Sequence, residues 1–288
     1  MLRFARAALL ALTATFVVTA CAPVGQNTPQ SIAGERRASA DVVNKLDRSG
    51  KLIKDRGLQN YLNGIVRRVA ATRPKGAVPI RAFIVKDADV NAFTTGGGYV
   101  FFNAGMLANL ENEAQVATVA AHEIAHIDRG HIQASRSNRT AVGIGAALAS
   151  IGAAAAGIDP RLVQGVVGLG ANAAVASFSR DQETDADNVG LRYLAAAGYN
   201  AVEGARSFEV LRRIHGRSRG ASFLASHPAP GNRQANLTNQ AKQLGATRGR
   251  IGKSAHDRAT RRLRREVLQF YERSGRRREA AQVRRNLR

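Results

Sequence analysis

Hydrophobic residues recur at helical spacing over two long stretches of the chain. From about Asp41 to Thr72, as in LQNYLNGIVRRVAA, apolar residues return every three or four positions, and Pro74 and Gly76 end the pattern. The second stretch runs from about residue 111 to residue 133 and contains VAAHEIAHIDRGHIQ. Both stretches predict helices with a buried face.

Two shorter segments between these helices have the composition of β-strands. VPIRAFIVK (78–86) and the aromatic GYVFFN (98–103) are bounded by breaker residues. NAFTTGGG (91–98) lies between them and carries the glycines of a turn. The pattern therefore predicts an α+β protein that is mainly helical and contains a small β-sheet.

A further segment, residues 141–178, is almost uncharged on both sides of a central IDPR turn. In one interpretation it is a helical hairpin inside the protein, whose small Ala and Gly residues permit close packing. In the other, the hairpin contacts or dips into lipid. Each arm is short and only weakly apolar, so we do not expect either arm to span a membrane by itself.

The net charge changes the picture. The 288 residues carry a formal charge of +22, which indicates an anionic partner such as nucleic acid, lipid headgroups or another acidic surface. Residues 245–288 alone hold 15 Lys and Arg against four Asp and Glu. Helical spacing continues there on both sides of Gly275, so we expect residues 241–288 to be a basic helical tail that contacts an anionic membrane or envelope surface.

The first residues have the organisation of a bacterial secretory signal. Arg3 and Arg6 precede an apolar run from Ala7 to Ala20, which is too short to span a bilayer comfortably. Val-Thr-Ala-Cys follows and resembles a lipobox, in which Cys21 carries the lipid. A cleaved signal with an incidental cysteine is the alternative.

The sequence around Cys21 also predicts domain boundaries and location. Cys21 is the only cysteine, which excludes an intramolecular disulfide. We expect a signal peptide at 1–20, a lipidated N-terminus and linker at 21–38, and the functional domain at 39–240. Ala22 after the cysteine resembles the signals of outer-membrane lipoproteins, which predicts a periplasmic protein anchored to the inner leaflet of that membrane. Nucleic acid is therefore not the expected partner.

HEIAH supplies the first candidate chemistry. His122 and His126 are four residues apart, so on a helix both imidazoles lie on one face and can bind one Zn²⁺ at about 2.1 Å each. Glu123 lies beside them and is the candidate general base for a water molecule. His131 is about 900° beyond His122 on a continuing helix and points to the opposite side. We expect it to be a polar residue near the helix end.

The segment SFSRDQETDADNVGLRYL (177–194) supplies a third candidate ligand. Glu183 and Asp187 are four residues apart, so a second helix presents both on one face. With Glu183 as the third ligand, a fourth position stays open, as catalytic zinc requires. Asp187 is placed to accept the free N–H of a zinc-binding histidine. Taken by itself the segment is more typical of a solvated acidic helix start, and only the HEIAH helix upstream favours a ligand.

Together with HEIAH, the sequence S-R-x-x-E-x-x-A-D resembles the HtpX-type and CAAX-prenyl-protease-type zinc metallopeptidases, which are gluzincins. NAFTTGGGYVFFNAGML (91–107) and ASHPAPGNRQANL (225–237) resemble two further elements of that family, and the matches cover about residues 56–237. In layout the chain is most similar to the periplasmic lipoprotein members, the beta-barrel assembly-enhancing proteases among them. It departs from the family at TTGG, where Leu/Ala-Pro-Gly is common.

The resemblance implies a zincin-like metalloprotease domain with one Zn²⁺ per chain and no other cofactor. It assigns the metal to His122, His126 and Glu183. It makes Glu123 the catalytic base and Asp187 the partner of a ligand histidine.

The histidine of the S/T-H-P element, here His227, has two alternative roles. The resemblance implies that it can bind the zinc and block the site, whereas stabilisation of the tetrahedral intermediate is the other role. An extended substrate is expected to pair with an edge strand near Gly98–Asn103.

The sequence thus predicts a zinc-dependent endopeptidase of the bacterial cell envelope, with misfolded or stalled envelope and outer-membrane polypeptides as its substrates. The alternative is a lipid-anchored chaperone-like or binding lipoprotein whose metal site is structural or self-blocked.

Overall fold

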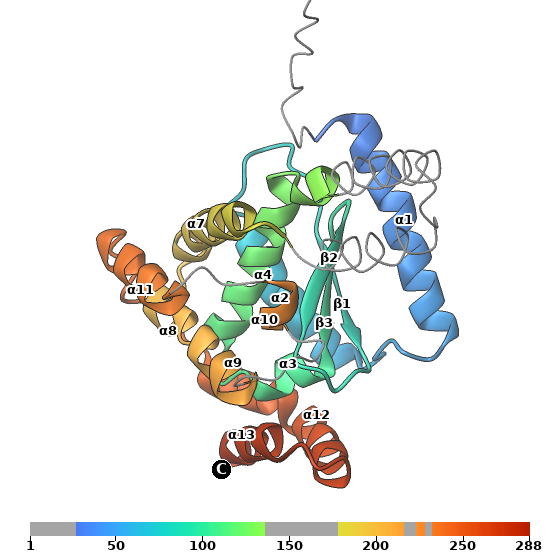
Figure 1. Cartoon of the computed structure of the whole chain (residues 1–288), viewed down its shortest axis with the longest axis vertical. Helices are drawn as coiled ribbons and strands as arrows, with labels where there is room; N and C mark the ends of the chain where they lie inside the picture. The colour runs from blue at the N-terminus through green and yellow to red at the C-terminus, as the bar shows by residue number, and fades with distance from the viewer. Residues whose placement is uncertain (1–26, 136–177, 216–222, 228–231) are drawn as a thin grey trace, which may run out of the picture.

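A computed structural model describes residues 27–135, 178–215, 223–227 and 232–288 (Figure 1). The fold is α+β and mainly helical, as predicted, with helices around one three-stranded sheet. The predicted signal peptide and Cys21 lie outside the described residues, and so do residues 141–177 of the uncharged segment. In the part of the chain that the structure describes, no helix is long and apolar enough to cross a membrane.

The sheet consists of β1 (Arg81–Val85), β2 (Ala92–Gly96) and β3 (Tyr99–Asn103), in the order β1-β3-β2. Strands were predicted for the segments that contain β1 and β3. The turn expected in NAFTTGGG is made by Gly97 and Gly98, but the residues before them form a further strand, β2, which was not predicted. Phe93, Thr94 and Thr95 favour a strand.

The order of the strands corrects a second expectation. β3 pairs with β1 in parallel and with β2 antiparallel, so it is the central strand. Its backbone groups on both sides are therefore engaged within the sheet, and Gly98–Asn103 is not an edge to which a substrate can add. The outer strands are β1 and β2.

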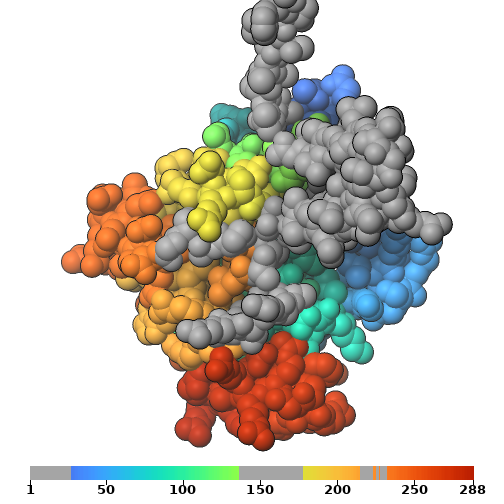
Figure 2. Space-filling model, viewed as in Figure 1, coloured from blue at the N-terminus to red at the C-terminus, as the bar shows by residue number. Residues whose placement is uncertain are grey.

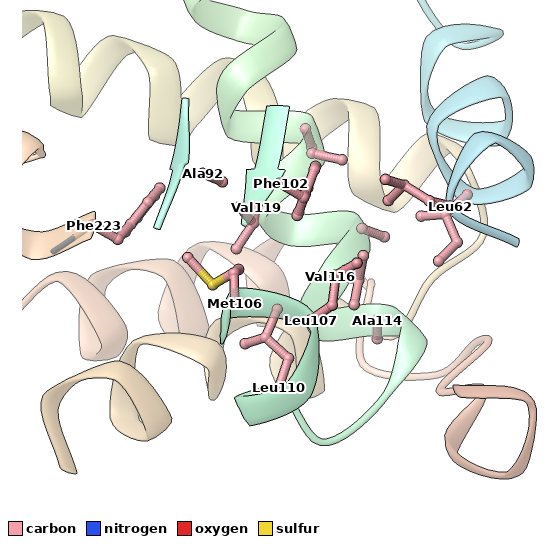
Figure 3. Close-up of a cluster of buried hydrophobic side chains, with 14 of the residues drawn as sticks. Leu62, Ala92, Phe102, Met106, Leu107, Leu110, Ala114, Val116, Val119 and Phe223 are labelled. Atoms are coloured by element: carbon pink, nitrogen blue, oxygen red, sulfur yellow. The ribbon is translucent and has the colours of Figure 1, made fainter. Parts of the chain in front are cut away.

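One hydrophobic core joins the sheet to the helices α2 (Arg56–Ala70), α3 (Ala104–Asn109) and α4 (Glu113–Asp128). Figure 3 shows side chains of all four elements meeting there. Leu62 of α2, Phe102 of β3, Leu107 of α3 and Val116 of α4 are each 0% exposed. Burial of one such side chain contributes about 1.5–3 kcal/mol. This core holds α4, which carries the HEIAH sequence, firmly beside the sheet.

The helix predicted from Asp41 to Thr72 is in fact two helices. α1 (Pro29–Arg48) stops before Gly50, whose φ of 65° is incompatible with a continuing helix. The chain then runs beside β1, where Leu52 bridges Val85, before α2 begins. α1 also begins earlier than expected, because Thr28 caps it and Pro29 suits a first helical turn. Residues 29–38 are consequently helix and not linker.

α1 rests against the turn between β2 and β3. Glu35 is buried and its Oε2 accepts a hydrogen bond of 2.8 Å from the N–H of Gly97. Gly97 has a φ of 60°, and a Cβ there would lie 2.5 Å from the backbone nitrogen of Arg36. This close approach requires glycine at position 97, which is the last residue of TTGG, the segment that differs from the common family sequence.

The longer regular elements of the second half of the chain are all helices in its described residues. α7 (Arg180–Ala196) lies along α4, and α8 (Ala201–Ala205), α9 (Ser207–His215), α10 (Phe223–Ser226) and α11 (Arg233–Gln243) continue around it (Figure 1). The last two helices, α12 (Lys253–Arg273) and α13 (Arg277–Leu287), form the lower end of the molecule (Figure 2).

These two helices flank Gly275, as predicted, but they are not a separate tail. They pack on α3, and their buried residues belong to the main core: Leu263, Val267, Tyr271, Ala280 and Val283. Most basic residues of this region therefore lie on the outer face of helices that pack into the main core, whereas Arg264 is buried.

Candidate metal centre

α4 positions three of the predicted residues. His122, Glu123 and His126 lie in its last two turns and are 2%, 0% and 0% exposed. The two imidazoles share one face of the helix, with ring centroids 4.6 Å apart and planes at 86°. The helix is buried on all sides because Ala and Val fill its other positions, so the histidines cannot turn outward to solvent.

α7 positions the two predicted carboxylates. Ser179 caps this helix in a capping box with Gln182, so the helix starts one turn before Glu183. Glu183 is 0% and Asp187 8% exposed. Further along, Gly190 permits α7 to approach α4 closely, because a Cβ there would lie 3.0 Å from the backbone of Ala121.

The donor atoms of four residues converge between α4 and α7. One atom each of His122, His126, Glu183 and His227 lies within 4.8 Å of all the others. The two Nε2 atoms of His122 and His126 are 3.0 Å apart. Glu183 Oε2 lies 3.4 Å from the first and Oε1 3.3 Å from the second. Ligands at about 2.1 Å from a tetrahedral zinc stand about 3.4 Å apart, so the spacing fits one such ion.

The chemistry of these donors also fits a metal ion. Imidazole nitrogens with one carboxylate are a donor set typical of catalytic zinc. Glu183 Oε2 and both oxygens of Glu123 are buried without a hydrogen-bond partner among the described residues. A buried carboxylate without a partner is costly, and a cation or a water molecule at this place removes the cost.

His227 enters the cluster from the end of α10. Its Nδ1 lies 3.2 Å from His122 Nε2 and 2.9 Å from Glu183 Oε1. Its Nε2 lies 3.4 Å from Glu123 Oε1. The ring of Phe223 stacks on the imidazole with centroids 4.4 Å apart. His227 thus lies where a fourth ligand, or a group acting on the substrate, has to lie.

Asp187 lies behind His122, on the side away from the cluster. Its Oδ1 is 3.0 Å from Nδ1 of the imidazole. Arg233, the first residue of α11, donates to the same oxygen at 2.5 Å, and its Nη1 lies 3.2 Å from Glu183 Oε2. The guanidinium is buried and lies 4.3 Å above the ring of Phe208. A buried cation therefore balances two buried carboxylates beside the centre.

His131 does not point away from the centre, so that expectation was wrong. Gly130 has a φ of 66° and follows the last turn of α4, and a separate helical segment begins at 131 and continues to 135. Nδ1 of His131 lies 2.9 Å from Nδ1 of His126, and Nε2 lies 3.2 Å from Asp185 Oδ2. The argument from rotation assumed a continuous helix, which one glycine interrupts.

Burial and neighbouring charges shift the pKa values of the centre. Burial raises the pKa of the Glu123 carboxyl, although His227 and His122 act in the opposite direction. Burial, together with the charge of His122, lowers the pKa of His126 well below its usual range. Burial and Arg233 lower the pKa of His122, but Glu183 and Asp187 outweigh them and raise it to about 9. A cation that binds here competes with a proton on His122.

The structure brings together the residues singled out in the sequence: His122, Glu123, His126, Glu183, Asp187 and His227. Sequence reasoning gave no role to Arg233, although this residue stands in the segment ASHPAPGNRQANL. It also missed Phe178, whose ring stacks on His126 with centroids 3.8 Å apart. Arg233 is the arginine of the resemblance to the family's S/T-H-P…R element, which gave it no role, whereas Phe178 carries no local signal and reaches the centre only through packing.

The chain is similar in sequence to known metalloproteases. The model of Peptidase family M48 matches residues 54–241. The beta-barrel assembly-enhancing protease of Escherichia coli is 28% identical over 222 residues, which are 74% of this chain and 45% of that protein. The putative beta-barrel assembly-enhancing protease of Vibrio cholerae is 30% identical over 200 residues, which are 67% of this chain and 41% of that protein. Metalloprotease LoiP of E. coli is 28% identical over 163 residues, which are 56% of this chain and 63% of that protein. The chain thus spans less than half the length of the first two relatives.

Proposed function

The chain belongs to peptidase family M48 and is by that membership a metallopeptidase, and on this premise we propose that it is a zinc-dependent endopeptidase of the bacterial cell envelope. One observation carries the proposal: the buried carboxylate of Glu123 stands beside a cluster of donor atoms at the spacing of a zinc site. The substrates are misfolded or stalled envelope and outer-membrane proteins. The names of the relatives, which are beta-barrel assembly-enhancing proteases, support this substrate class.

In the proposed mechanism His122, His126 and Glu183 hold the zinc. A bound zinc polarises the scissile carbonyl and makes a water molecule acidic near neutral pH. Glu123 accepts the proton of the attacking water and passes it to the leaving amine. Burial raises the pKa of this carboxyl, so it holds a proton more readily than an exposed glutamate does.

Asp187 and Arg233 orient the ligands and do not react. Asp187 Oδ1 accepts the Nδ1 proton of His122, which leaves Nε2 free for the metal. Arg233 holds Asp187 in place and keeps it ionised, since the nearby guanidinium lowers the pKa of that carboxyl against the effect of burial. The proton on Nδ1 of His122 thus has a permanent acceptor.

His227 is proposed to be a plug. Its Nδ1 lies among the donor atoms of the cluster, where it excludes the attacking water when it binds the zinc. It must move away before cleavage begins. The same contact is what favours the alternative function, a chaperone-like lipoprotein with a self-blocked metal centre.

A substrate in extended form is proposed to add to β2 and not to β3. β2 is an outer strand of the sheet and lies beside α4. The N–H of Phe223 already donates to the carbonyl of Val90, just before β2, with a length of 3.1 Å. A polypeptide that pairs with this edge lies next to the segment that ends in His227, so substrate binding and removal of the plug are coupled.

The proposed location follows from the N-terminal sequence. Cys21 is the lipidation site that holds the protein on the periplasmic side of the outer membrane. At the other end of the chain Arg258, Arg261 and Arg265 are exposed along one face of α12, at helical spacing. This face is proposed to contact an anionic membrane or envelope surface through long-range attraction.

The test uses the purified chain without its signal peptide and an unfolded protein as substrate. We expect cleavage that a zinc chelator abolishes, that added Zn²⁺ restores, and that Glu123→Gln eliminates while zinc stays bound. If the protein binds zinc and prevents aggregation of the substrate but leaves it uncut, with His227→Ala as well as without it, the chaperone-like alternative replaces the proposal.

A further inference from the structure

The interruption of the helix at the end of α4 creates a contact behind His126. Gly130 breaks the helix, and the next residue, His131, lies under the imidazole of His126 with their Nδ1 atoms 2.9 Å apart. His131 is 7% exposed. Two nitrogen atoms at this distance share one proton, so one of them donates and the other accepts.

The direction of this hydrogen bond follows from the other end of the His126 ring. Nε2 of His126 faces the cluster, 3.0 Å from His122 Nε2 and 3.3 Å from Glu183 Oε1. A ring that gives its Nε2 lone pair to a metal carries its proton on Nδ1. His126 is therefore the donor, and Nδ1 of His131 is the acceptor.

The second nitrogen of His131 agrees with this assignment. With Nδ1 as acceptor, the neutral ring carries its proton on Nε2. That atom lies 3.2 Å from Oδ2 of Asp185, which accepts it. The side chain of Arg129 holds the same oxygen at 2.6 Å and so fixes the carboxylate. Every donor in the series from His126 to Asp185 meets an acceptor.

We propose that His131 and Asp185 are positioning residues that orient His126 for the metal, in the way that Asp187 orients His122. The proposal rests on the proposed role of His126 as a zinc ligand. α7 then supplies a ligand and both supporting carboxylates, namely Glu183, Asp185 and Asp187. Asp187 contacts its ligand histidine directly, whereas Asp185 acts on His126 through the imidazole of His131.

This series makes the two histidine ligands unequal. Asp187 is buried and contacts its histidine directly, whereas the side chain of Asp185 is 34% exposed and acts through His131. Water weakens the electrostatic effect of an exposed carboxylate. The acceptor on His131 therefore matters more for His126 than the charge of Asp185 does.

The test compares two replacements of similar size at His131. In His131→Asn the amide oxygen lies near the place of Nδ1 and can accept from His126, whereas His131→Leu has no acceptor there. We expect Leu to weaken zinc affinity about 10–100-fold, the usual effect of losing a partner of a ligand histidine, and Asn to stay near the wild-type value. Affinity is measured by competition with a chelator, and coordination geometry by the visible absorption of the Co²⁺-substituted protein.

Controls separate this proposal from the proposed function. Asp187→Asn is the positive control, and Asp181→Asn, an exposed carboxylate at the start of the same helix, should have no effect. Asp185→Asn should weaken zinc binding roughly tenfold or less. Thermal unfolding of each variant without metal reports on folding alone.

The outcomes are distinct. If the wild type binds zinc and loses it in His126→Ala, but His131→Leu keeps the wild-type affinity and Co²⁺ spectrum, the positioning role is wrong while the zinc site stands. Equal losses in the Leu and Asn variants also overturn it, because packing and not the acceptor is then responsible. If His126→Ala binds zinc normally, the ligand assignment itself fails.

Discussion

Nδ1 of His227 lies 2.9 Å from Oε1 of Glu183, between the two helices that carry the other donors of the cluster. These two residues come from α7 and from the segment after α10, which are far apart in the sequence. The contact places an additional imidazole beside the donor atoms that α4 and α7 supply.

The first prediction concerns this contact. His227→Ala should raise basal cleavage of an unfolded substrate about tenfold, because removal of the imidazole opens the position of the attacking water. Glu123→Gln serves as the inactive control. A tenfold fall in the rate would show instead that His227 stabilises the transition state, and the plug would have to be abandoned.

The second prediction concerns metal content. We expect about one Zn²⁺ per chain, by analogy with catalytic zinc sites. Replacing His122, His126 or Glu183 by Ala should remove most of it, because each loses one of three protein ligands, whereas Glu123→Gln should retain it. Elemental analysis of the purified variants is the measurement. Loss of the metal in Glu123→Gln would mean that this carboxylate is a ligand and not a base.

The third prediction concerns anchoring. Cys21→Ser should abolish lipid labelling and move the protein from the membrane to the soluble periplasmic fraction, because no other cysteine is present. Fractionation with and without high salt tests it. A variant that stays on the membrane and leaves it only in high salt would implicate the basic face of α12, because salt screens exposed charges over about 10 Å at 0.1 M. Retention in high salt would implicate the segment 141–178.

The fourth prediction concerns pH and His256, which is buried in α12. Its Nε2 donates to the carbonyl of Leu110 at 3.0 Å, and its Nδ1 accepts from Tyr61 at 2.9 Å. Burial, together with Arg264, lowers the pKa of His256 to about 3. In the unfolded chain a histidine titrates near 6.5. Between those two values the unfolded state binds the additional proton, so stability falls as the pH falls from about 6.5 towards 3.

His256→Gln keeps a donor for Leu110 but does not titrate. Urea unfolding of both proteins at pH 7 and pH 5 should show a steeper loss of stability in the wild type, by about 1 kcal/mol per pH unit. The same pH dependence in both proteins would exclude His256 as its source.

The fifth prediction concerns the integration of the basic C-terminal helices. Arg264 is 1% exposed and donates to the carbonyls of Leu110 and Asn286 and to Asp257. Arg264→Met should cost about 3 kcal/mol of unfolding free energy, because it removes these hydrogen bonds of a buried guanidinium, although Leu110 and Asp257 keep their hydrogen bonds to His256 and Lys253. Arg262→Met is the matched control, since Arg262 forms an exposed pair with Glu266 on the same helix and should contribute less than about 1 kcal/mol. Equal effects would show that α12 is only loosely attached.

Several elements of the centre were accessible from sequence because they depend on local geometry. Residues four apart on a helix share one face, so the spacing alone pairs His122 with His126, and Glu183 with Asp187. The pattern of breaker residues likewise located β1 and β3. A resemblance to metallopeptidases then joined the two pairs, which spacing alone could not do.

The tertiary structure decided the relations between segments that are distant in sequence. β3 is the central strand because the residues before the turn glycines form β2, which pairs with β3 on the side opposite β1. Arg233 reached Asp187 only because α11 packs beside α7.

Spacing along the chain determined by itself which side chains share one face of a helix, because the helix repeat is a local property. Only the fold decided what supports them. His131 shows the difference: a continuing helix would have turned it away from His126, but a single left-handed glycine interrupts the helix, and the two rings are in contact. Such contacts depend on how buried segments fill space together, and no local pattern encodes them.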